Sequence, residues 1–224
     1  MADSPSLQGQ HILIASGPTR APIDAVRYIG NRSTGRLGSA IGTELLRRGA
    51  KVTFVYGTGS LVPGETSPNL VLEEIETIDE AEDFLIRHLR EREVFAVIMA
   101  LAGLDYRPKE VSTDKLSSEP EERTITLVKC RKIIDQVKTV SPSTLLVGFK
   151  LEAGISEEEL FSRADDLARR AQCDLVVANR TEDIDRDRHR VWIRRADRHI
   201  IGPLETPGEI AAALVDELAR LGCE

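Results

Sequence analysis

The chain has 224 residues, of which 41% are hydrophobic and 30% are charged, and its formal net charge at pH 7 is −7. This length and apolar content suit one large domain with a real core, whereas the acidic balance argues against a general nucleic-acid-binding surface, which needs a basic footprint. The three cysteines, Cys130, Cys173 and Cys223, are scattered and include no CxxC pair, so the sequence predicts neither a disulfide scaffold nor a zinc site.

The N-terminal segment and the apolar runs bear on location. The first ten residues, MADSPSLQGQ, are polar and lack the basic-then-apolar profile of a signal peptide. The longest apolar run, residues 94–103, has about half the length of a membrane span. We therefore expect a polar tail over residues 1–10, a single domain over residues 11–224, a cytoplasmic location, and neither a membrane nor a nucleic-acid partner.

Strand-like and helix-like segments alternate along the domain. A buried-strand run at 11–16 is followed by an amphipathic helix pattern at 39–49 and a β-branched strand at 51–56. The later patterns are helices at 79–93, 156–172 and 207–222, strands at 94–103, 144–149 and 174–179, and a hairpin over 190–202. This alternation predicts an α/β fold, namely a Rossmann-like, mostly parallel sheet flanked by helices, with a small β excursion or hairpin. Such sheets bind ligands at the carboxyl ends of their strands.

The connection after the first strand is unusually long. A strand-to-helix turn commonly takes about 2–6 residues, but here residues 17–35, GPTRAPIDAVRYIGNRSTG, separate the strand from its helix. Long ordered loops in compact domains are usually functional, although some are only decorative. The stretch GNRSTGRLG at 30–38 resembles a Walker A loop, but Arg36 stands in place of the lysine and Leu37 in place of the magnesium-binding hydroxyl.

The same stretch predicts an anion site at the start of a helix. Ser33 and Thr34 supply hydroxyl groups at the mouth of the helix. Gly35 and Gly38 leave its first turn without side chains, so that free N–H groups and the helix dipole can hold an anion. Asn31 can donate and accept hydrogen bonds at once, which suits a carbonyl or carboxylate group. An ordinary N-cap is the alternative for Ser33 or Thr34, but it accounts for neither Asn31 nor the spaced glycines.

Four segments in a fixed order carry a family resemblance. The first is ILIASGPTRAPIDAVRYIGNRSTGRLG, in which a Gly-Pro-Thr turn is followed by an Asn-x-Ser-Thr-Gly stretch. The others are ALAGLDYRPKEVSTDKL at 100–116, VGFKLE at 147–152 and DLVVAN at 174–179. Together they resemble phosphopantothenoylcysteine synthetase, and most of all its stand-alone bacterial form. Nothing in the sequence resembles the flavin-dependent decarboxylase half of the bacterial fusion protein.

The resemblance implies a ligase that joins 4'-phosphopantothenate to L-cysteine in coenzyme A biosynthesis. A nucleoside triphosphate would activate the carboxylate as an acyl-nucleotidylate with release of pyrophosphate, and attack by the cysteine amine would release the monophosphate. The bacterial branch implies CTP and CMP, with ATP as the alternative, and Mg2+ as the companion of the triphosphate. The family also implies a homodimer, with residues 103–130 as a dimerisation and active-site loop region, and a separate decarboxylase downstream in the pathway.

The resemblance also assigns roles to individual residues. Asn31 would hold the substrate carboxylate and then the acyl carbonyl, and Lys115 would neutralise the charge that develops at the acyl-phosphate. The nucleotide-binding set would comprise Gly17, Thr19, Ser33, Gly35, Gly38, Met99, Ala100, Leu101, Asp105, Phe149 and Asn179. Taken alone, the four least specific of these residues have ordinary structural alternatives: a strand-end turn for Asp105, a solvated loop lysine for Lys115, a core position for Phe149 and a turn for Asn179. Arg27 would either orient the loop internally or meet a partner subunit, and both alternatives stay open.

Two departures from the family pattern concern basic residues. The family's Lys-x-Lys-Lys in the mobile loop reads Lys115-Leu116-Ser117-Ser118 here, so only the first lysine remains. Two family lysines on the helix before DLVVAN fall at Leu167 and Ala171. That helix also carries Arg163, Arg169 and Arg170. These arginines either compensate for the missing lysines or form a solvated helix face, and we prefer the second interpretation.

Other functions receive less support. A non-catalytic nucleotide or phosphopantothenate-binding protein of the same fold is the main alternative, because the loop lysines are reduced. A nicotinamide-dependent oxidoreductase would carry a complete GxGxxG motif after the first strand, and this sequence lacks one there. GTGSLV at 57–62 is interpreted as a turn, and DIDRD at 183–187 is rejected as a calcium loop because Arg188 replaces the required glycine. The four histidines show no metal-ligand spacing.

Overall fold

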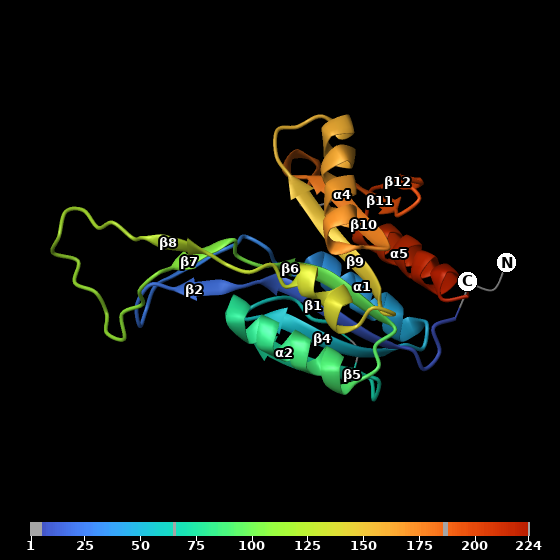
Figure 1. The fold of residues 1–224 in the computed structure, drawn as a ribbon, viewed down its shortest axis with the longest axis horizontal. Coiled ribbons are helices and arrows are strands. Elements are labelled where there is room, and N and C mark those ends of the chain that lie inside the picture. The colour runs from blue at the N-terminus through green and yellow to red at the C-terminus, as the bar shows by residue number, and fades with distance from the viewer. Residues whose placement is uncertain (1–5, 65, 186–187, 224) are drawn as a thin grey trace.

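A central eight-stranded sheet organises the computed structural model, which describes residues 6–64, 66–185 and 188–223 (Figure 1). Its strand order is β12-β11-β10-β9-β6-β1-β4-β5. The strands are β1 (His11–Pro18), β4 (Lys51–Gly57), β5 (Leu70–Ile75), β6 (Ala96–Ala102), β9 (Leu145–Glu152), β10 (Leu175–Arg180), β11 (Val191–Arg195) and β12 (Ile200–Leu204). Every pairing from β5 to β10 is parallel, and only β11 and β12 pair antiparallel. The predicted Rossmann-like α/β class is confirmed.

Helices cover both faces of this sheet. The helices α1 (Arg36–Arg47) and α5 (Pro207–Leu221) contact each other and pack on one face, which we call the α1 face. The helices α2 (Ile78–Glu91), α3 (Ile134–Val140) and α4 (Glu157–Ala171) pack on the other, the α4 face. Side chains of a strand alternate between the two cores: Ile12 and Ile14 of β1 lie in the α1-face core, and Leu13 and Ala15 lie in the α4-face core.

The strand order reverses between β1 and β6. From β1 the chain passes through α1 to β4 and then β5 on one side, and through α2 to β6, β9 and β10 on the other. Because the connections leave in opposite directions, a crevice opens at the carboxyl ends of β1 and β6. The register pairs Ser16 with Ala100, Gly17 with Leu101 and Pro18 with Ala102 at this point.

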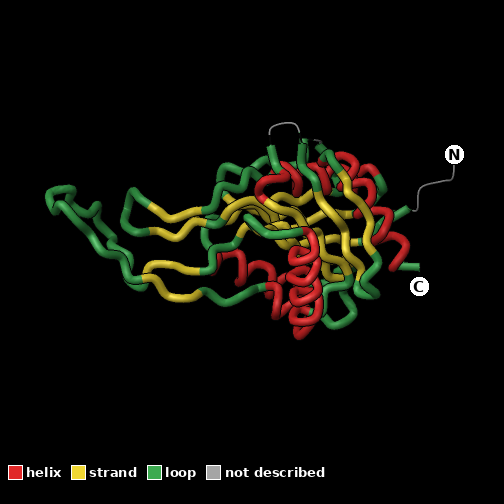
Figure 2. Tube along the Cα trace, turned by 90° about the horizontal axis from the view of Figure 1, so that it is seen from above, coloured by secondary structure: helices red, strands yellow, loops and turns green. Residues whose placement is uncertain are grey.

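Two antiparallel hairpins project from the body of the molecule (Figure 2). One consists of β2 (Arg20–Pro22) and β3 (Tyr28–Gly30), and the other of β7 (Tyr106–Pro108) and β8 (Leu127–Lys129). We call residues 106–129 the arm, since it extends well beyond the sheet with an irregular tip (Figure 1). The arm occupies most of the predicted 103–130 excursion; a role in dimerisation remains a prediction.

The local differences from the sequence prediction have identifiable causes. Helix α1 begins at Arg36, three residues before the predicted start, because Gly35 takes a left-handed conformation (φ 74°) at the N-cap. Ser156 caps α4 by accepting a hydrogen bond from the Glu159 N–H at 3.1 Å. Within the expected polar tail, residues 1–5 lie outside the described residues, and Leu7 is buried in the α1-face core.

No helix in the described ranges is long and apolar enough to cross a lipid bilayer.

A histidine pair lies beneath the α4 face, remote from the carboxyl ends of the strands. The Nε2 atoms of His11, which begins β1, and His88, near the end of α2, are 3.4 Å apart, and His11 Nε2 also lies 3.0 Å from Thr53 Oγ1. The ring of Phe84 stacks on His88. Burial lowers the pKa of His88 to about 4, and the neighbouring His11 and Arg92 reinforce this effect. Burial also lowers the pKa of His11.

We expect this pair to make folding sensitive to acid. A histidine whose pKa is lower in the folded state, about 4 for His88, than its ordinary value of about 6.5 contributes stability above pH 6.5 that is lost as the pH falls toward 4. Because His88 is only partly buried, we expect on the order of 1 kcal/mol. Urea unfolding at pH 7 and pH 5 should show a smaller pH effect in His88→Gln than in the wild type. The exposed His199 gives the control His199→Gln. An equal change in unfolding free energy between pH 7 and pH 5 in all three proteins would contradict the prediction.

Candidate functional site

Glycines allow three segments to meet at the carboxyl end of β1. A Cβ on Gly38 would lie 2.1 Å from Ser16 Oγ and 2.6 Å from Ser16 Cβ, so the first turn of α1 rests directly on β1. A Cβ on Gly17, where φ is +82°, would lie 1.9 Å from Ser60 Oγ. Gly35 also packs against Ser60. The GTGSLV segment is therefore a turn, as predicted, and its Ser60 fills the space between the two glycines.

The start of α1 presents backbone N–H groups without a side-chain cap. Gly35 is the N-cap residue and makes no side-chain cap hydrogen bond. Ser33 Oγ instead accepts a hydrogen bond from the Gly35 N–H at 3.4 Å. The N-cap alternative for Ser33 and Thr34 is wrong, because neither side chain caps the helix. The N–H groups at a helix N-terminus favour an anion.

Asn31 lies at the boundary between the two faces of the sheet. Its Nδ2 donates a 2.7 Å hydrogen bond to the Ala102 carbonyl at the end of β6. Thr19, which is fully buried, fixes the same segment: its N–H donates to the Ala102 carbonyl at 3.3 Å, and its Oγ1 accepts from the Leu104 N–H at 3.1 Å. Thr19 thus positions residues 102–104. Asn31 itself is exposed and keeps its Oδ1 and a second N–H for other partners.

Strand alternation divides the predicted nucleotide-binding set between the two faces. Phe149 of β9 packs with the α1-face core. Asn179 of β10 follows the same alternation, is only 6% exposed, and lies with its Nδ2 3.2 Å from His189 Nε2. The predicted residues on this face are thus Ser33, Gly35, Gly38, Ala100, Phe149 and Asn179. Met99 and Leu101 point to the opposite face, where they contribute to the α4-face core.

His189 was not identified from the sequence, because histidine spacing carries no signal here. It follows the described part of the loop that leaves β10, where Arg36 donates to the Asp185 carbonyl at 3.4 Å. Burial lowers the pKa of His189, and the positive charge of Arg36 adds to this effect. His189 is therefore a neutral imidazole at pH 7, close to the first turn of α1.

The α4 face holds a cavity of about 320 Å³ at the carboxyl ends of β6 and β9, which we call the α4-face cavity. Its walls are apolar on the sheet side and basic at the rim. The apolar lining includes Ile78, Met99, Leu101, Leu104, Ile133, Ile134, Leu167 and also Phe149, which packs with the α1-face core as well. The basic lining is Arg131, Lys132, Lys150, Arg163 and Arg170, with Asp166 as the acidic residue. Leu101 and Gly103 flank Ala102, the residue that holds Asn31. The cavity therefore begins beside Asn31.

The three α4 arginines are exposed, as the preferred interpretation expects, but two of them also border the cavity. Arg163 and Arg170 line the cavity, whereas Arg169 does not and pairs with Asp166 on the helix surface. Arg170 also pairs with Asp135 of α3. The sequence pattern missed this because a helical repeat shows which residues share a face, but not whether a neighbouring helix closes a cavity over that face.

Asp105 and Lys132 form an ion pair at the mouth of the same cavity. Asp105 was predicted to contact nucleotide or metal. Lys132 was not singled out, since it stands in a short polar connection before α3. Lys150 pairs with the half-buried Glu152 at 2.6 Å, so carboxylates partly balance the cationic rim.

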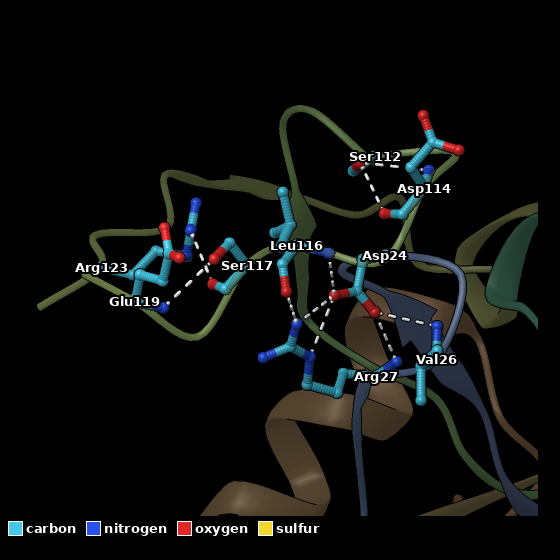
Figure 3. Close-up of polar contacts among 9 residues, drawn as sticks. All are labelled: Asp24, Val26, Arg27, Ser112, Asp114, Leu116, Ser117, Glu119 and Arg123. Carbon is cyan, nitrogen blue, oxygen red and sulfur yellow. Dashed lines mark hydrogen bonds and ion pairs between the residues drawn. The ribbon is translucent and has the colours of Figure 1, made fainter. Parts of the chain in front are cut away.

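Lys115 lies on the arm, outside the set of residues that line the cavity. Its neighbour Leu116 is fixed by a network around the buried Asp24 (Figure 3). One carboxylate oxygen of Asp24 accepts the N–H groups of Val26 and Arg27, and the other accepts Arg27 Nε at 2.9 Å and the Leu116 N–H at 3.1 Å. Arg27 also donates to the Leu116 carbonyl at 2.6 Å. Arg27 thus orients the loop internally, the first of the two alternatives.

The carboxylate of Asp24 is held ionised by this network. Burial by itself would raise its pKa, but the three backbone N–H donors and Arg27 outweigh burial and hold the pKa well below its usual range. The contacts are therefore complete across the neutral range and weaken only in strong acid.

Within the described residues, no group of three or more His, Cys, Asp and Glu side chains is arranged to hold a metal ion.

Comparison with known proteins adds a family to this geometry. Residues 7–221 match the model of the DNA/pantothenate metabolism flavoprotein C-terminal domain. The coenzyme A biosynthesis bifunctional protein CoaBC of Thermococcus kodakarensis is 37% identical over 216 residues, which cover 96% of this chain and 52% of that protein. The chain thus spans about half the length of the curated relatives it matches.

Solved structures agree with the family match. A DNA/pantothenate metabolism flavoprotein from Streptococcus pneumoniae superposes with a TM-score of 0.87 at 29% identity and covers 95% of this chain and 100% of its own. The C-terminal domain of a CoaBC bifunctional protein superposes with a TM-score of 0.78 at 28% identity, covering 97% and 98% of the two chains.

The contact between Gly38 and Ser16 predicts a strong steric effect. In Gly38→Ala the new Cβ would meet Ser16 Cβ at 2.6 Å, which rotation of the hydroxyl cannot relieve, so α1 must move from β1. We expect a loss of about 1–3 kcal/mol in unfolding free energy by urea titration. Gly208→Ala, in the first turn of α5 with no atom within 4 Å of its Cβ, is the matched control and should be neutral or stabilising. Equal losses of unfolding free energy in Gly38→Ala and Gly208→Ala would contradict the close packing of α1 on β1.

The Asp24 network predicts a local effect on the arm. In Asp24→Asn one carboxylate oxygen becomes an NH2 donor, which cannot accept the bonds from Arg27 Nε and the Leu116 N–H. We expect faster amide exchange and faster limited proteolysis within the arm, with the sheet still protected. Asp114→Asn changes an exposed arm carboxylate and should leave both rates unchanged. Unchanged arm protection in Asp24→Asn would show that the network does not hold the arm.

Proposed function

The chain belongs to the DNA/pantothenate metabolism flavoprotein C-terminal domain family, and on this ground we propose that it is a phosphopantothenate–cysteine ligase of coenzyme A biosynthesis. The reaction would join 4'-phosphopantothenate to L-cysteine through an acyl-nucleotidylate. The carboxylate oxygen attacks the α-phosphorus and pyrophosphate leaves. The cysteine amine then attacks the acyl carbon, and the nucleoside monophosphate leaves. The product would pass to a decarboxylase of the same pathway.

The position of Asn31 is the observation that carries this proposal. Attack of a carboxylate on a phosphate brings like charges together, so the groups that lower the barrier must stand ready where these charges meet. Asn31 is fixed by Ala102 between the first turn of α1 and the α4-face cavity. Its remaining N–H can donate to the carboxylate and then to the acyl carbonyl, without reorganisation during the reaction.

The α1 face suits the nucleotide. The N–H groups at the start of α1, with Ser33 beside them, would bind the phosphates. Phe149, which packs with the α1-face core and also lines the α4-face cavity, offers an apolar surface for the base or ribose. Asn179 with His189 offers polar groups on the α1 face. CTP is the proposed nucleotide from the bacterial branch, and ATP is the alternative, since these contacts do not select between them.

Magnesium is proposed as a companion of the triphosphate. Mg2+ commonly keeps several waters and is bound through one or two carboxylates together with substrate phosphates, which fits a site without a dedicated cluster of ligands within the described ranges. Asp105, exposed at the cavity mouth, is the carboxylate proposed for it. The ion would neutralise charge on the leaving pyrophosphate.

Lys115 is proposed to act across a homodimer. It lies on the projecting arm, whose anchored segment at Leu116 gives the lysine a defined origin. An arm of this kind can bring Lys115 to the crevice of a second copy of the chain. The loss of the lysines expected at Ser117 and Ser118 leaves a non-catalytic binding protein as the alternative function.

Pyrophosphate release tests the proposal. With Mg2+, 4'-phosphopantothenate and CTP, the protein should release pyrophosphate in repeated turnovers only when cysteine is present, and substitution of ATP tests the nucleotide. Asn31→Ala should lower kcat by about 10²–10³-fold, the cost of one preorganised donor. Asn69→Ala, before the amino end of β5, is the matched control and should retain full activity.

Two results would contradict this account. Nucleotide binding without release of pyrophosphate from either nucleotide would favour the non-catalytic alternative. Full activity in Asn31→Ala would remove the role of Asn31.

A further inference from the structure

We propose that Arg20 is a positioning residue for Asn31, which it holds at the site by stacking on Tyr28 and tying the hairpin of β2 and β3 to the body of the molecule. The inference rests on the proposed function, because it takes Asn31 as the residue that meets the reacting carboxylate. It adds a residue outside the predicted site, and one that acts through Asn31 without touching a substrate.

The position of Asn31 depends on a small hairpin. Asn31 follows directly on β3, and its side chain donates to the Ala102 carbonyl at 2.7 Å. The hairpin has three residues in each strand, and a two-stranded ribbon is at best marginally stable by itself. The contacts that tie this hairpin to the body therefore decide how firmly Asn31 is held.

The backbone of Arg20 ties the first strand of the hairpin to the start of α2. Its N–H donates to the Glu76 carbonyl at 2.7 Å, and Glu76 directly precedes Thr77, the capping-box residue of α2. Arg20 also pairs with Gly30 across the hairpin. Arg20 thus stands between a capped helix and the residue that precedes Asn31.

The side chain of Arg20 extends this attachment to the second strand. Its guanidinium carbon lies 4.4 Å from the centroid of the Tyr28 ring, a distance at which a cation over an aromatic face is attracted. The same guanidinium donates to the Thr58 carbonyl at 3.4 Å and pairs with Glu76 at 3.5 Å. One side chain therefore joins β3 to the loops that follow β4 and β5, and we call these contacts the Arg20 brace.

The Tyr28 ring carries the restraint toward Asn31. A Cβ on Gly30 would lie 3.4 Å from the ring, so the ring lies along the strand beside Gly30. Tyr28 is 50% exposed, and the Arg20 guanidinium covers one of its faces. Without the guanidinium, we expect residues 28–31 to gain freedom, so that the Asn31 amide is no longer oriented before the substrates react.

Direct binding of an anion by Arg20 is the alternative role, because arginine commonly binds phosphate. Its side chain is 24% exposed, and its guanidinium already contacts Tyr28, Thr58 and Glu76, which favours positioning. The two roles have different kinetic results. Loss of an anion contact raises the dissociation constant of a substrate, whereas loss of positioning lowers kcat with both substrates bound.

Kinetic measurements on Arg20→Ala and Tyr28→Leu test the positioning role. We expect kcat for pyrophosphate release to fall about fivefold in each variant, the size of one exposed cation–π contact. The dissociation constants of 4'-phosphopantothenate and of the nucleotide with Mg2+ should stay within about twofold of the wild type. Tyr28→Phe keeps the ring and should retain kcat. Arg87→Ala removes another exposed arginine that lies over an aromatic ring, and it is the matched control with unchanged kcat.

A double-mutant cycle separates positioning of Asn31 from a general structural effect. In the Asn31→Ala background, Arg20→Ala should lower kcat further by less than about twofold, because the residue that it positions is already absent. A loss of about fivefold in both backgrounds would overturn the inference. A rise of about tenfold in either dissociation constant in Arg20→Ala would overturn it too and assign Arg20 to a bound anion.

Amide hydrogen exchange gives a measurement that does not depend on activity. Residues 28–31 should exchange faster in Arg20→Ala and Tyr28→Leu, with β1 still protected, and Arg87→Ala should match the wild type. Unchanged exchange at residues 28–31 would overturn the Arg20 brace even in an active enzyme. Absence of turnover by the wild type would instead refute the proposed function, whatever the exchange rates.

Discussion

The reversal of strand order between β1 and β6 is the constraint on which the rest of the site depends. Because the connections from these strands leave toward opposite faces, a crevice opens at their carboxyl ends, and a loop from β1 can cross the end of β6. Asn31 and Thr19 make that crossing by bonding to residues 102–104. Gly38 lets α1 start directly on β1, which brings the helix N-terminus to the same point.

Most of the fold could be predicted from the sequence, since its long elements have strong patterns. The strand at 11–16 and the helix at 156–172 were placed to within about two residues. The parts that were missed have weak local signals. Strand β5 exposes Val71 and Leu72 at the sheet edge, so it shows no clean alternation. Helix α3 has seven residues, too few for a helical period to stand out.

The candidate site likewise has parts that could be predicted from the sequence and parts that could not. The segment from Gly17 to Gly38 could be found because its length and glycines are unusual before a helix. The cavity that Phe149 and Leu101 line together could not, because it follows from strand pairing and helix packing in three dimensions. Lys132 gave no signal in sequence, since its importance comes from the cavity that α3 and α4 enclose. The role of Arg27 likewise became clear only from its contacts with Asp24 and Leu116.

The central claim is that Asn31, fixed by the Ala102 carbonyl, holds the reacting carboxylate of the acyl substrate. A crystal structure of the protein with 4'-phosphopantothenate and an unreactive triphosphate analogue tests it most directly. The account predicts the acyl carboxylate hydrogen-bonded to Asn31, beside the Ala102 carbonyl. An acyl carboxylate bound away from Asn31 would contradict it.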